Sequence, residues 1–197
     1  MLVVSAIHAS AAVLLVVAGA AKLSRPQQGW TGLLGFGVRP ALVRLAGTVE
    51  AAVGLAALCV AGLATWGVGL LYAAFALIVW RGVLAGAGSC GCFGRLDAPP
   101  SWVHVAGNLV LAAASFAAAG TAGPPVVEIA DLARSQPAAA VTLAVEIVVI
   151  AGLVLVAFTA LPEALGARNA RRRGPDLFGA VAGYAAGARG SRSEGSM

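Results

Sequence analysis

The sequence predicts an all-α integral membrane protein, a four-helix transmembrane bundle followed by a fifth transmembrane helix. Of its 197 residues, 60% are hydrophobic and only 11% are charged, and the mean hydropathy is +0.92. A water-soluble domain of this composition would expose too much apolar surface to stay in solution. Five apolar runs, divided by charged residues, proline and glycine, are each long enough to cross a hydrocarbon core of about 30 Å.

These runs predict the five spans in order. They cover residues 2–21, 41–63, 64–84, 103–122 and 138–161. The first span has no basic residue before it and is followed by Lys22, so we expect a membrane helix rather than a cleaved signal peptide. The second and third spans meet within "AGLATW", which predicts a helical hairpin with almost no loop.

Composition divides the chain into three parts. Residues 1–122 form the expected four-helix membrane domain, and residues 123–163 form a loop and the fifth membrane helix. Residues 164–197 are rich in Gly, Ala, Arg and Ser, and their apolar patch is too short to span a bilayer. We therefore expect a basic tail that is disordered or lies on the membrane surface.

Basic residues are distributed unequally between the two membrane faces. With five spans, twelve of the thirteen Lys and Arg residues fall on the face that contains the loop after the third span and the C-terminal tail, and only Arg134 falls on the other. Basic residues are retained in the cytoplasm during insertion. The sequence therefore predicts a multi-pass protein of a bacterial inner membrane, with its N-terminus outside and the loop and C-terminus in the cytoplasm.

Polar residues gather at that same face. Glu50 lies six residues after Arg44, and Asn108 lies six residues after Trp102, which places each about 9 Å inside the membrane surface. His104 lies one helical turn before Asn108, on a stripe that Ser115 continues, and Lys22 ends the first span. Ionisable groups inside a bilayer are costly and usually have a partner or a function. We expect Lys22, Glu50, His104 and Asn108 to form a polar pocket.

Helix packing near Glu50 is also predictable. Gly47 and Gly54 lie on the same helical face as Glu50, and small residues permit close approach of a second helix. An alternative to the pocket is therefore that Glu50 pairs with Lys22 or Arg44 and that Asn108 bonds a neighbouring helix, all as structural interactions. Glu146, in the fifth span, lies at another level and is expected to bond between helices, to meet His8 or to contact another subunit.

The segment "GSCGCFG" contains the pair of cysteines Cys90 and Cys92, separated by one glycine. A disulfide within so short a ring is strained, which favours a catalytic or labile bond over a structural one. It would also stabilise the fold little, because the loop it closes is short. Nearby cationic groups, Lys22 among them, favour the reactive thiolate. Cys59 lies about 22 Å from this face and is expected to be a small buried side chain.

A metal site is another use of these residues that remains open. Cys90, Cys92, His104 and Glu50 include the donor types of a metal site, although zinc sites usually space their cysteines two to four residues apart. The chain contains no phosphate-binding loop, no nucleophile elbow and no nucleic-acid surface, so we expect no nucleic-acid partner.

Four motifs together resemble the MauE family, methylamine-utilisation membrane proteins grouped with DoxX. They are "GAAKL" at 19–23, Glu50 to Gly54, "CGCFG" at 90–94 and Asn108, within about residues 1–120. The resemblance implies a four-helix bundle like that of quinone-linked disulfide-forming membrane proteins, with a thioredoxin-like partner. It also implies that Cys90 and Cys92 are the redox pair, and quinone enters as a cofactor by this analogy alone.

The leading functional hypothesis is a membrane thiol–disulfide oxidoreductase that uses Cys90 and Cys92. The alternative is a non-catalytic accessory or assembly subunit of a larger membrane complex. A role in exported disulfides implies that the cysteines face outward, whereas the charge distribution places them in the cytoplasm. The direction of electron flow is therefore left open.

Overall fold

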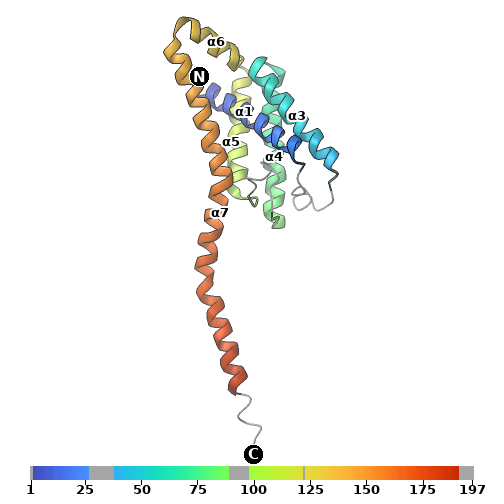
Figure 1. The fold of residues 1–197 in the computed structure, drawn as a ribbon, viewed down its shortest axis with the longest axis vertical. Coiled ribbons are helices and arrows are strands. Elements are labelled where there is room, and N and C mark those ends of the chain that lie inside the picture. Colours follow the sequence, from blue (N-terminus) through green and yellow to red (C-terminus); the bar gives the residue numbers. More distant parts are fainter. Residues whose placement is uncertain (1, 27–37, 89–97, 122, 191–197) are drawn as a thin grey trace, which may run out of the picture. The chain divides into compact units, whose positions relative to one another are not determined.

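In the computed structural model, the described residues are 2–26, 38–88, 98–121 and 123–190, with side chains described no further than residue 168. These ranges contain six helices and no strand, which confirms the all-α class (Figure 1). The helices are α1 (Leu2–Ser24), α3 (Pro40–Cys59), α4 (Leu63–Ala85), α5 (Trp102–Ala119), α6 (Pro125–Ser135) and α7 (Pro137–Gly190).

Five of these helices are long and apolar enough to cross a membrane, as predicted. They are α1, α3, α4, α5 and the part of α7 within Pro137–Arg168. The α3–α4 connection has only three residues, and Gly62 adopts a φ of 82°, which L side chains rarely tolerate. The expected tight hairpin is therefore confirmed. We call the end of the bundle with this connection the turn end, and the opposite end, where α1 and α4 terminate, the loop end.

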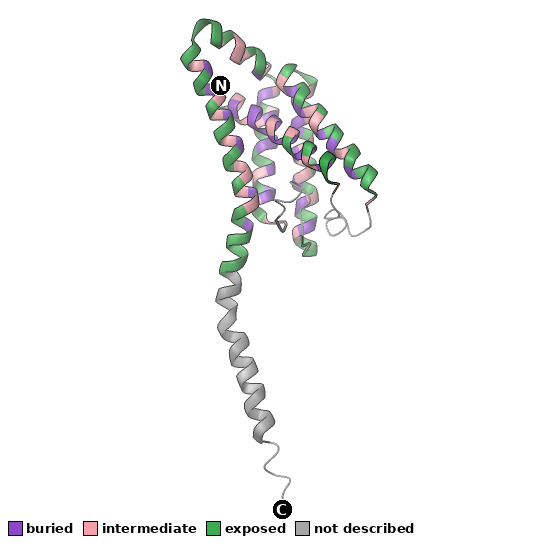
Figure 2. Cartoon of the chain, in the orientation of Figure 1, coloured by how far each residue is buried: buried purple, intermediate pink, exposed green. Residues whose placement is uncertain are grey.

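Helix α1 is the central helix of the bundle. Its most apolar window is 56% buried, compared with 22–39% for the other four spans, and Figure 2 shows buried residues along its length. Its closest neighbour is α3, while α4 pairs closely with α5. A Cβ added to Gly54 would lie 2.6 Å from the Ala12 carbonyl oxygen, and one added to Gly47 would lie 2.8 Å from Lys22 Cβ. The predicted close approach at these glycines is thus confirmed.

The core joins the membrane helices across the bundle. Its main cluster includes Leu15 of α1, Val68 of α4, Leu111 of α5 and Phe158 of α7. In a second cluster, Ala6 and Ala9 of α1 pack against Leu143 and Ile147 of α7. The fifth membrane helix therefore packs against the four-helix core through two separate sets of side chains.

Two segments differ from the sequence-based expectation. The loop expected after residue 122 contains the short helix α6, which starts at Pro125 because proline suits the first helical turn. Helix α7 continues to Gly190, although a disordered or surface-lying tail was expected from residue 164. Alanine and arginine, frequent in this tail, are strong helix formers. By contacts, the chain forms two units, Met1–Pro162 and Glu163–Met197.

Candidate functional site

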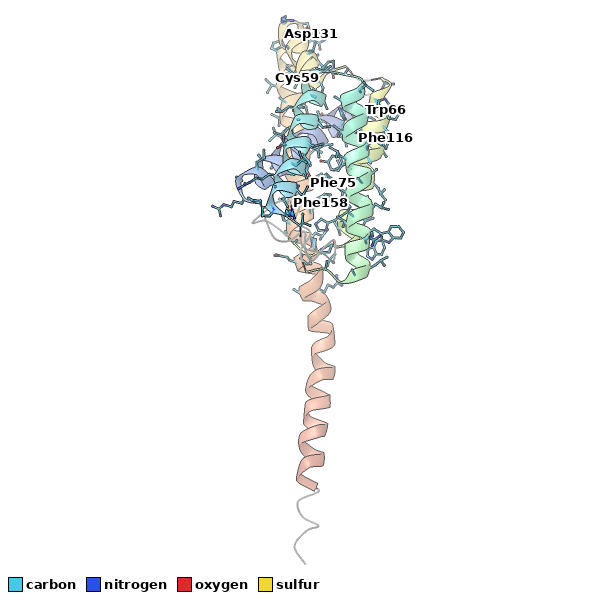
Figure 3. The ribbon with its side chains drawn as sticks, turned by 90° about the vertical axis from the view of Figure 1, so that its right-hand side faces the viewer. Cys59, Trp66, Phe75, Phe116, Asp131 and Phe158 are labelled. Atoms are coloured by element: carbon cyan, nitrogen blue, oxygen red, sulfur yellow. The ribbon has the colours of Figure 1, made fainter. Side chains whose placement is uncertain are left out.

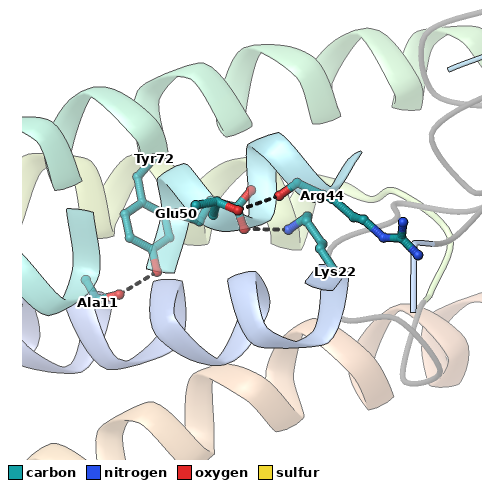
Figure 4. Close-up of polar contacts among 6 residues, drawn as sticks. Ala11, Lys22, Arg44, Glu50 and Tyr72 are labelled. Carbon is teal, nitrogen blue, oxygen red and sulfur yellow. Dashed lines mark hydrogen bonds and ion pairs between the residues drawn. The ribbon is translucent and has the colours of Figure 1, made fainter. Parts of the chain in front are cut away.

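Lys22 and Glu50 form a buried ion pair near the loop end. Lys22 Nζ donates a hydrogen bond to Glu50 Oε2 at 2.7 Å, and the two side chains are only 4% and 2% exposed (Figure 4). Lys22 lies in the last turn of α1 and Glu50 in the middle of α3. The absence of a side chain at Gly47 brings the two backbones close enough for this contact. Of the alternatives for Glu50, the Lys22 pair is the one that forms.

A third helix contributes to this ion pair. Lys22 Nζ lies 5.9 Å from the centroid of the Phe75 ring of α4. A cation at this distance is attracted to the negative face of an aromatic ring, and more strongly where water is excluded. Helices α1, α3 and α4 therefore all stabilise the ammonium group. No sequence pattern singled out Phe75, because an aromatic residue on an apolar helix has many other uses.

His104 is fixed by two residues that the sequence analysis did not single out. Its Nδ1 lies 2.9 Å from the hydroxyl oxygen of Ser101, the residue before α5, and its ring centroid lies 5.1 Å from that of Phe158. The Phe158 ring occupies the space that a Cβ at Gly107 would need. The fifth helix therefore positions a residue of the predicted pocket. Ser101 was recognisable as a helix-capping residue three positions before His104, whereas Phe158 had no such signal.

Asn108 is the fourth predicted pocket residue. It lies one turn after His104 on α5 and is buried. Within the described ranges, no hydrogen bond joins its carboxamide to another residue, so the expected bond to a neighbouring helix is not seen there. All four predicted pocket residues are buried, but the contacts join Lys22 to Glu50 and His104 to Ser101 and Phe158.

Cys90 and Cys92 lie outside the described residues, as does the rest of residues 89–97. The two ends of this segment are described. Helix α4 ends at Ala85, and the next residue, Gly86, has a φ of 65° that turns the chain out of the helix. The chain is described again from the buried Ala98. The described residues on either side of this segment therefore lie at the loop end, the same end as the Lys22–Glu50 pair.

The third cysteine is not where we expected it. Cys59 is exposed, as the last residue of α3, so the expectation of burial was wrong. Helical rise gave its depth but not which side of α3 it occupies, and neighbouring Val60 is also exposed. Figure 3 shows Cys59 toward the same end as Asp131 of α6, the turn end.

Ser115 belongs to a different polar cluster. Its hydroxyl oxygen lies 3.2 Å from Nδ1 of His8, and both residues are buried. The stripe that His104, Asn108 and Ser115 share is confirmed as a buried face of α5, but its last member bonds α1. Among the described residues, no ion pair or hydrogen bond joins His8 to Glu146.

A metal site at the predicted pocket would need the two cysteines. Within the described ranges, no three His, Cys, Asp or Glu side chains gather closely enough to hold a metal ion. Because Cys90 and Cys92 fall outside those ranges, the metal alternative stays a prediction.

Comparison with known families gives one match. The sequence model described as "Methylamine utilisation protein MauE" matches residues 1–123, well over half of the chain. No curated protein and no solved structure matches the chain significantly. The matched region contains α1, α3, α4 and α5, and therefore Lys22, Glu50, His104 and Asn108. It ends before α6 and α7, so Phe158 of α7 lies outside the matched region. The chain is a multi-helix membrane protein that belongs to the MauE family.

Proposed function

We propose that this protein is a membrane thiol–disulfide oxidoreductase in which Cys90 and Cys92 are the redox pair. The observation that carries the proposal is the buried Lys22–Glu50 ion pair at the end of the bundle where α4 ends, shortly before Cys90 and Cys92 in the sequence. Burying two charges is expensive and rarely justified by stability alone, because apolar residues of similar volume often stabilise a fold as well. A redox role would explain why the Lys22–Glu50 ion pair is retained, because its two groups can stabilise a thiolate and transfer a proton.

The proposed exchange moves two electrons and two protons between a partner protein, the cysteine pair and a quinone. A thiolate of a thioredoxin-like partner attacks one sulfur of the Cys90–Cys92 disulfide and forms a mixed disulfide. The second partner thiol then releases the reduced Cys90 and Cys92, so two electrons and two protons pass to this protein. A quinone, reduced to quinol by the same two electrons and two protons, regenerates the disulfide. The reverse sequence transfers electrons outward to the partner.

Each buried polar group has a proposed role in this exchange. The Lys22 ammonium stabilises a nearby thiolate by its charge, and the Glu50 carboxylate accepts or returns a proton. His104, oriented by Ser101 and Phe158, is a second proton carrier, and Asn108 offers a hydrogen bond to a quinone oxygen or a thiolate. The partner, the quinone and these roles come from the resemblance to quinone-linked disulfide-forming proteins.

The protein is proposed to lie in a bacterial inner membrane with the loop end in the cytoplasm. Basic residues support this orientation, since Arg25, Arg39, Arg44 and Arg81 all belong to the loop end and are exposed. Arg134, at the turn end, is paired with Asp131 at 2.9 Å. Positive charge retained in the cytoplasm then places Cys59 on the outer face.

A gel-shift experiment with a large maleimide tests both the chemistry and the orientation. In a Cys59→Ser background, Cys90 and Cys92 are the two remaining cysteines. We expect no shift from the protein as isolated under non-reducing conditions and a double shift after reduction. A double shift without reductant, together with unchanged function of the Cys90→Ser/Cys92→Ser variant, would overturn the redox proposal.

Cys59 supplies the matched control for orientation. In intact cells, a membrane-impermeant maleimide is expected to label Cys59 in the Cys90→Ser/Cys92→Ser variant but not the reduced pair in the Cys59→Ser variant. The opposite pattern would place the loop end outside and contradict the orientation while leaving the redox chemistry intact.

A second candidate function is an accessory subunit of a larger membrane complex. It is favoured by Glu146, an acid in a membrane helix with no ion-pair partner among the described residues. The cysteine variants distinguish the two functions, because an accessory subunit keeps its function when Cys90 and Cys92 are replaced by serine.

A further inference from the structure

Helices α6 and α7 enclose a groove that the four-helix core does not use. Its volume is about 500 Å³, and it is lined by Leu132, Gln136, Ala139, Thr142, Leu143 and Glu146. Glu146 is half-buried, and it lies on the flank of α7 between the side that packs on α1 and the side that is exposed. The groove lies toward the turn end, because α6 connects α5 to the start of α7 there.

Glu146 differs in its contacts from Glu50, the acid within the membrane span of α3. Glu50 has Lys22 at 2.7 Å, whereas in the described part of the chain no Lys, Arg or His side chain forms an ion pair with Glu146. The nearby Thr142 hydroxyl donates to the Ala138 carbonyl oxygen instead. Glu146 is nine residues after Pro137, about 14 Å along the helix from its start, and therefore within the apolar part of the span.

An unpaired carboxylate at this depth needs an interaction partner that compensates its charge. Its insertion into the hydrocarbon region is costly, and acyl chains offer it neither hydrogen bonds nor charge. The partner is a cation or a hydrogen-bond donor from outside this chain. A second copy in the same orientation does not provide a lysine or arginine at this level, because Arg134 is the only such residue in the described part of the turn-end half and it is paired with Asp131.

We propose that the groove binds a transmembrane helix of another protein that carries a Lys or Arg at the level of Glu146. The exposed side of α7 next to the groove is apolar and offers the rest of such an interface, with Val141, Val145, Val148 and Val149 between 50% and 69% exposed. Interhelical polar contacts and close packing are the main forces between helices in lipid. This site is independent of the proposed redox chemistry, which belongs to the opposite end of the bundle.

The test uses synthetic leucine-rich membrane helices as defined probes. One probe carries a single Lys at the level of Glu146, a second carries it at the loop-end level, and a third has only leucine. The full-length Cys90→Ser/Cys92→Ser variant is labelled with a donor fluorophore at the exposed Cys59, which is at the same end as α6. Energy transfer to acceptor-labelled probes is measured in phosphatidylcholine vesicles.

We expect the level-matched Lys probe to bind at least tenfold more tightly than either other probe. Glu146→Gln should abolish this preference, Glu146→Lys should transfer it to a probe with a level-matched Glu, and the exposed Glu163→Gln serves as the matched control. Equal binding of all three probes overturns the proposal. Energy transfer between copies that Glu146→Gln removes assigns the groove to self-association instead, and loss of the preference on adding phosphatidylethanolamine assigns it to a lipid amine.

Discussion

His8 of α1 and Ser115 of α5 bond to each other across the bundle, with Nδ1 and Oγ 3.2 Å apart. Nε2 of the same imidazole is buried and has no hydrogen-bond partner in the described structure. The histidine is therefore anchored on one side only. Among the described residues, the Ser115 hydroxyl is the only polar group that contacts the imidazole, so the serine is expected to contribute to the stability of the fold.

Ser115→Ala is expected to destabilise the protein. It leaves both imidazole nitrogens buried without partners, and one unsatisfied buried group costs about 1–3 kcal/mol. The measurement is the free energy of unfolding in mixed micelles as dodecyl sulfate is added, followed by circular dichroism. The double variant His8→Leu/Ser115→Ala should recover most of this loss, since it removes the polar groups together. A double variant no more stable than Ser115→Ala would contradict this account.

Breaking the Lys22–Glu50 pair should cost more. Lys22→Met or Glu50→Gln leaves one polar group of the pair buried without its partner, at a cost of about 3–5 kcal/mol where the remaining group is charged. The double variant should be markedly more stable than the sum of the single effects predicts, because neither charge is then left. Additive effects in the same unfolding assay would show that the pair is not coupled.

These variants also separate structural from chemical roles. If Lys22 and Glu50 act only in packing, the well-folded double variant should react with thiol reagents at the wild-type rate. We expect it instead to show slower alkylation of the reduced cysteine pair near neutral pH, because the ammonium that favours thiolate is gone. Alkylation rates measured between pH 6 and 9 in the Cys59→Ser background provide the test.

Gly54→Ala is expected to force α1 and α3 apart. The new Cβ would lie 2.6 Å from the Ala12 carbonyl oxygen, a backbone atom that moves only with its helix, so we expect a loss of about 1–3 kcal/mol. Gly152→Ala on α7 is the matched control, since a Cβ there meets no atom within 4 Å. The control should be neutral or up to about 1 kcal/mol more stable, from its higher helix propensity. Equal effects at the two sites would argue against close helix contact at Gly54.

Phe158→Ala should loosen His104. The ring fills a space beside Gly107 and lies against the imidazole at an interplanar angle of 46°, and truncation of a buried phenylalanine to alanine costs about 3–5 kcal/mol. Leu153→Ala, at a position 64% exposed on the same helix, should cost much less. Nitrogen-15 chemical shifts of His104 in the two variants report whether the ring environment changes. An unchanged His104 spectrum in Phe158→Ala would remove α7 from the proposed site.

Much of the fold follows from the sequence because a bilayer accepts few structures. Once the apolar runs are counted, the five spans follow. Gly47 and Gly54 on the face of Glu50 predict a close approach of some second helix, and in the structure that helix is α1. The pairing of Lys22 with Glu50 was one of two stated options, since both basic candidates lay at the same end. Because burying a charge in a bilayer is costly, the few charged residues within the spans are expected to have partners, and this makes their pairing predictable from the sequence.

The missed features depend on information that spacing does not contain. Cys59 has a predictable depth, but its side of the helix depends on where α3 packs, and only coordinates supply that. Helix α6 is short and carries Glu128, Asp131 and Arg134, so it gives no signal of a membrane span. The ring contact between Phe158 and His104 joins α7 to α5 across fifty-odd residues, and no local pattern relates those positions.

The ion pair between α1 and α3 also bears on membrane insertion, because its two residues are synthesised one after the other. Lys22 leaves the ribosome 28 residues before Glu50, so the first helix reaches the membrane with an unneutralised ammonium group at its trailing end. Its lateral release into lipid is favoured only once the second helix arrives with the compensating carboxylate. We therefore expect nascent chains that end before Glu50 to remain at the insertion machinery, and chains that extend past α3 to leave it as a pre-assembled helical pair.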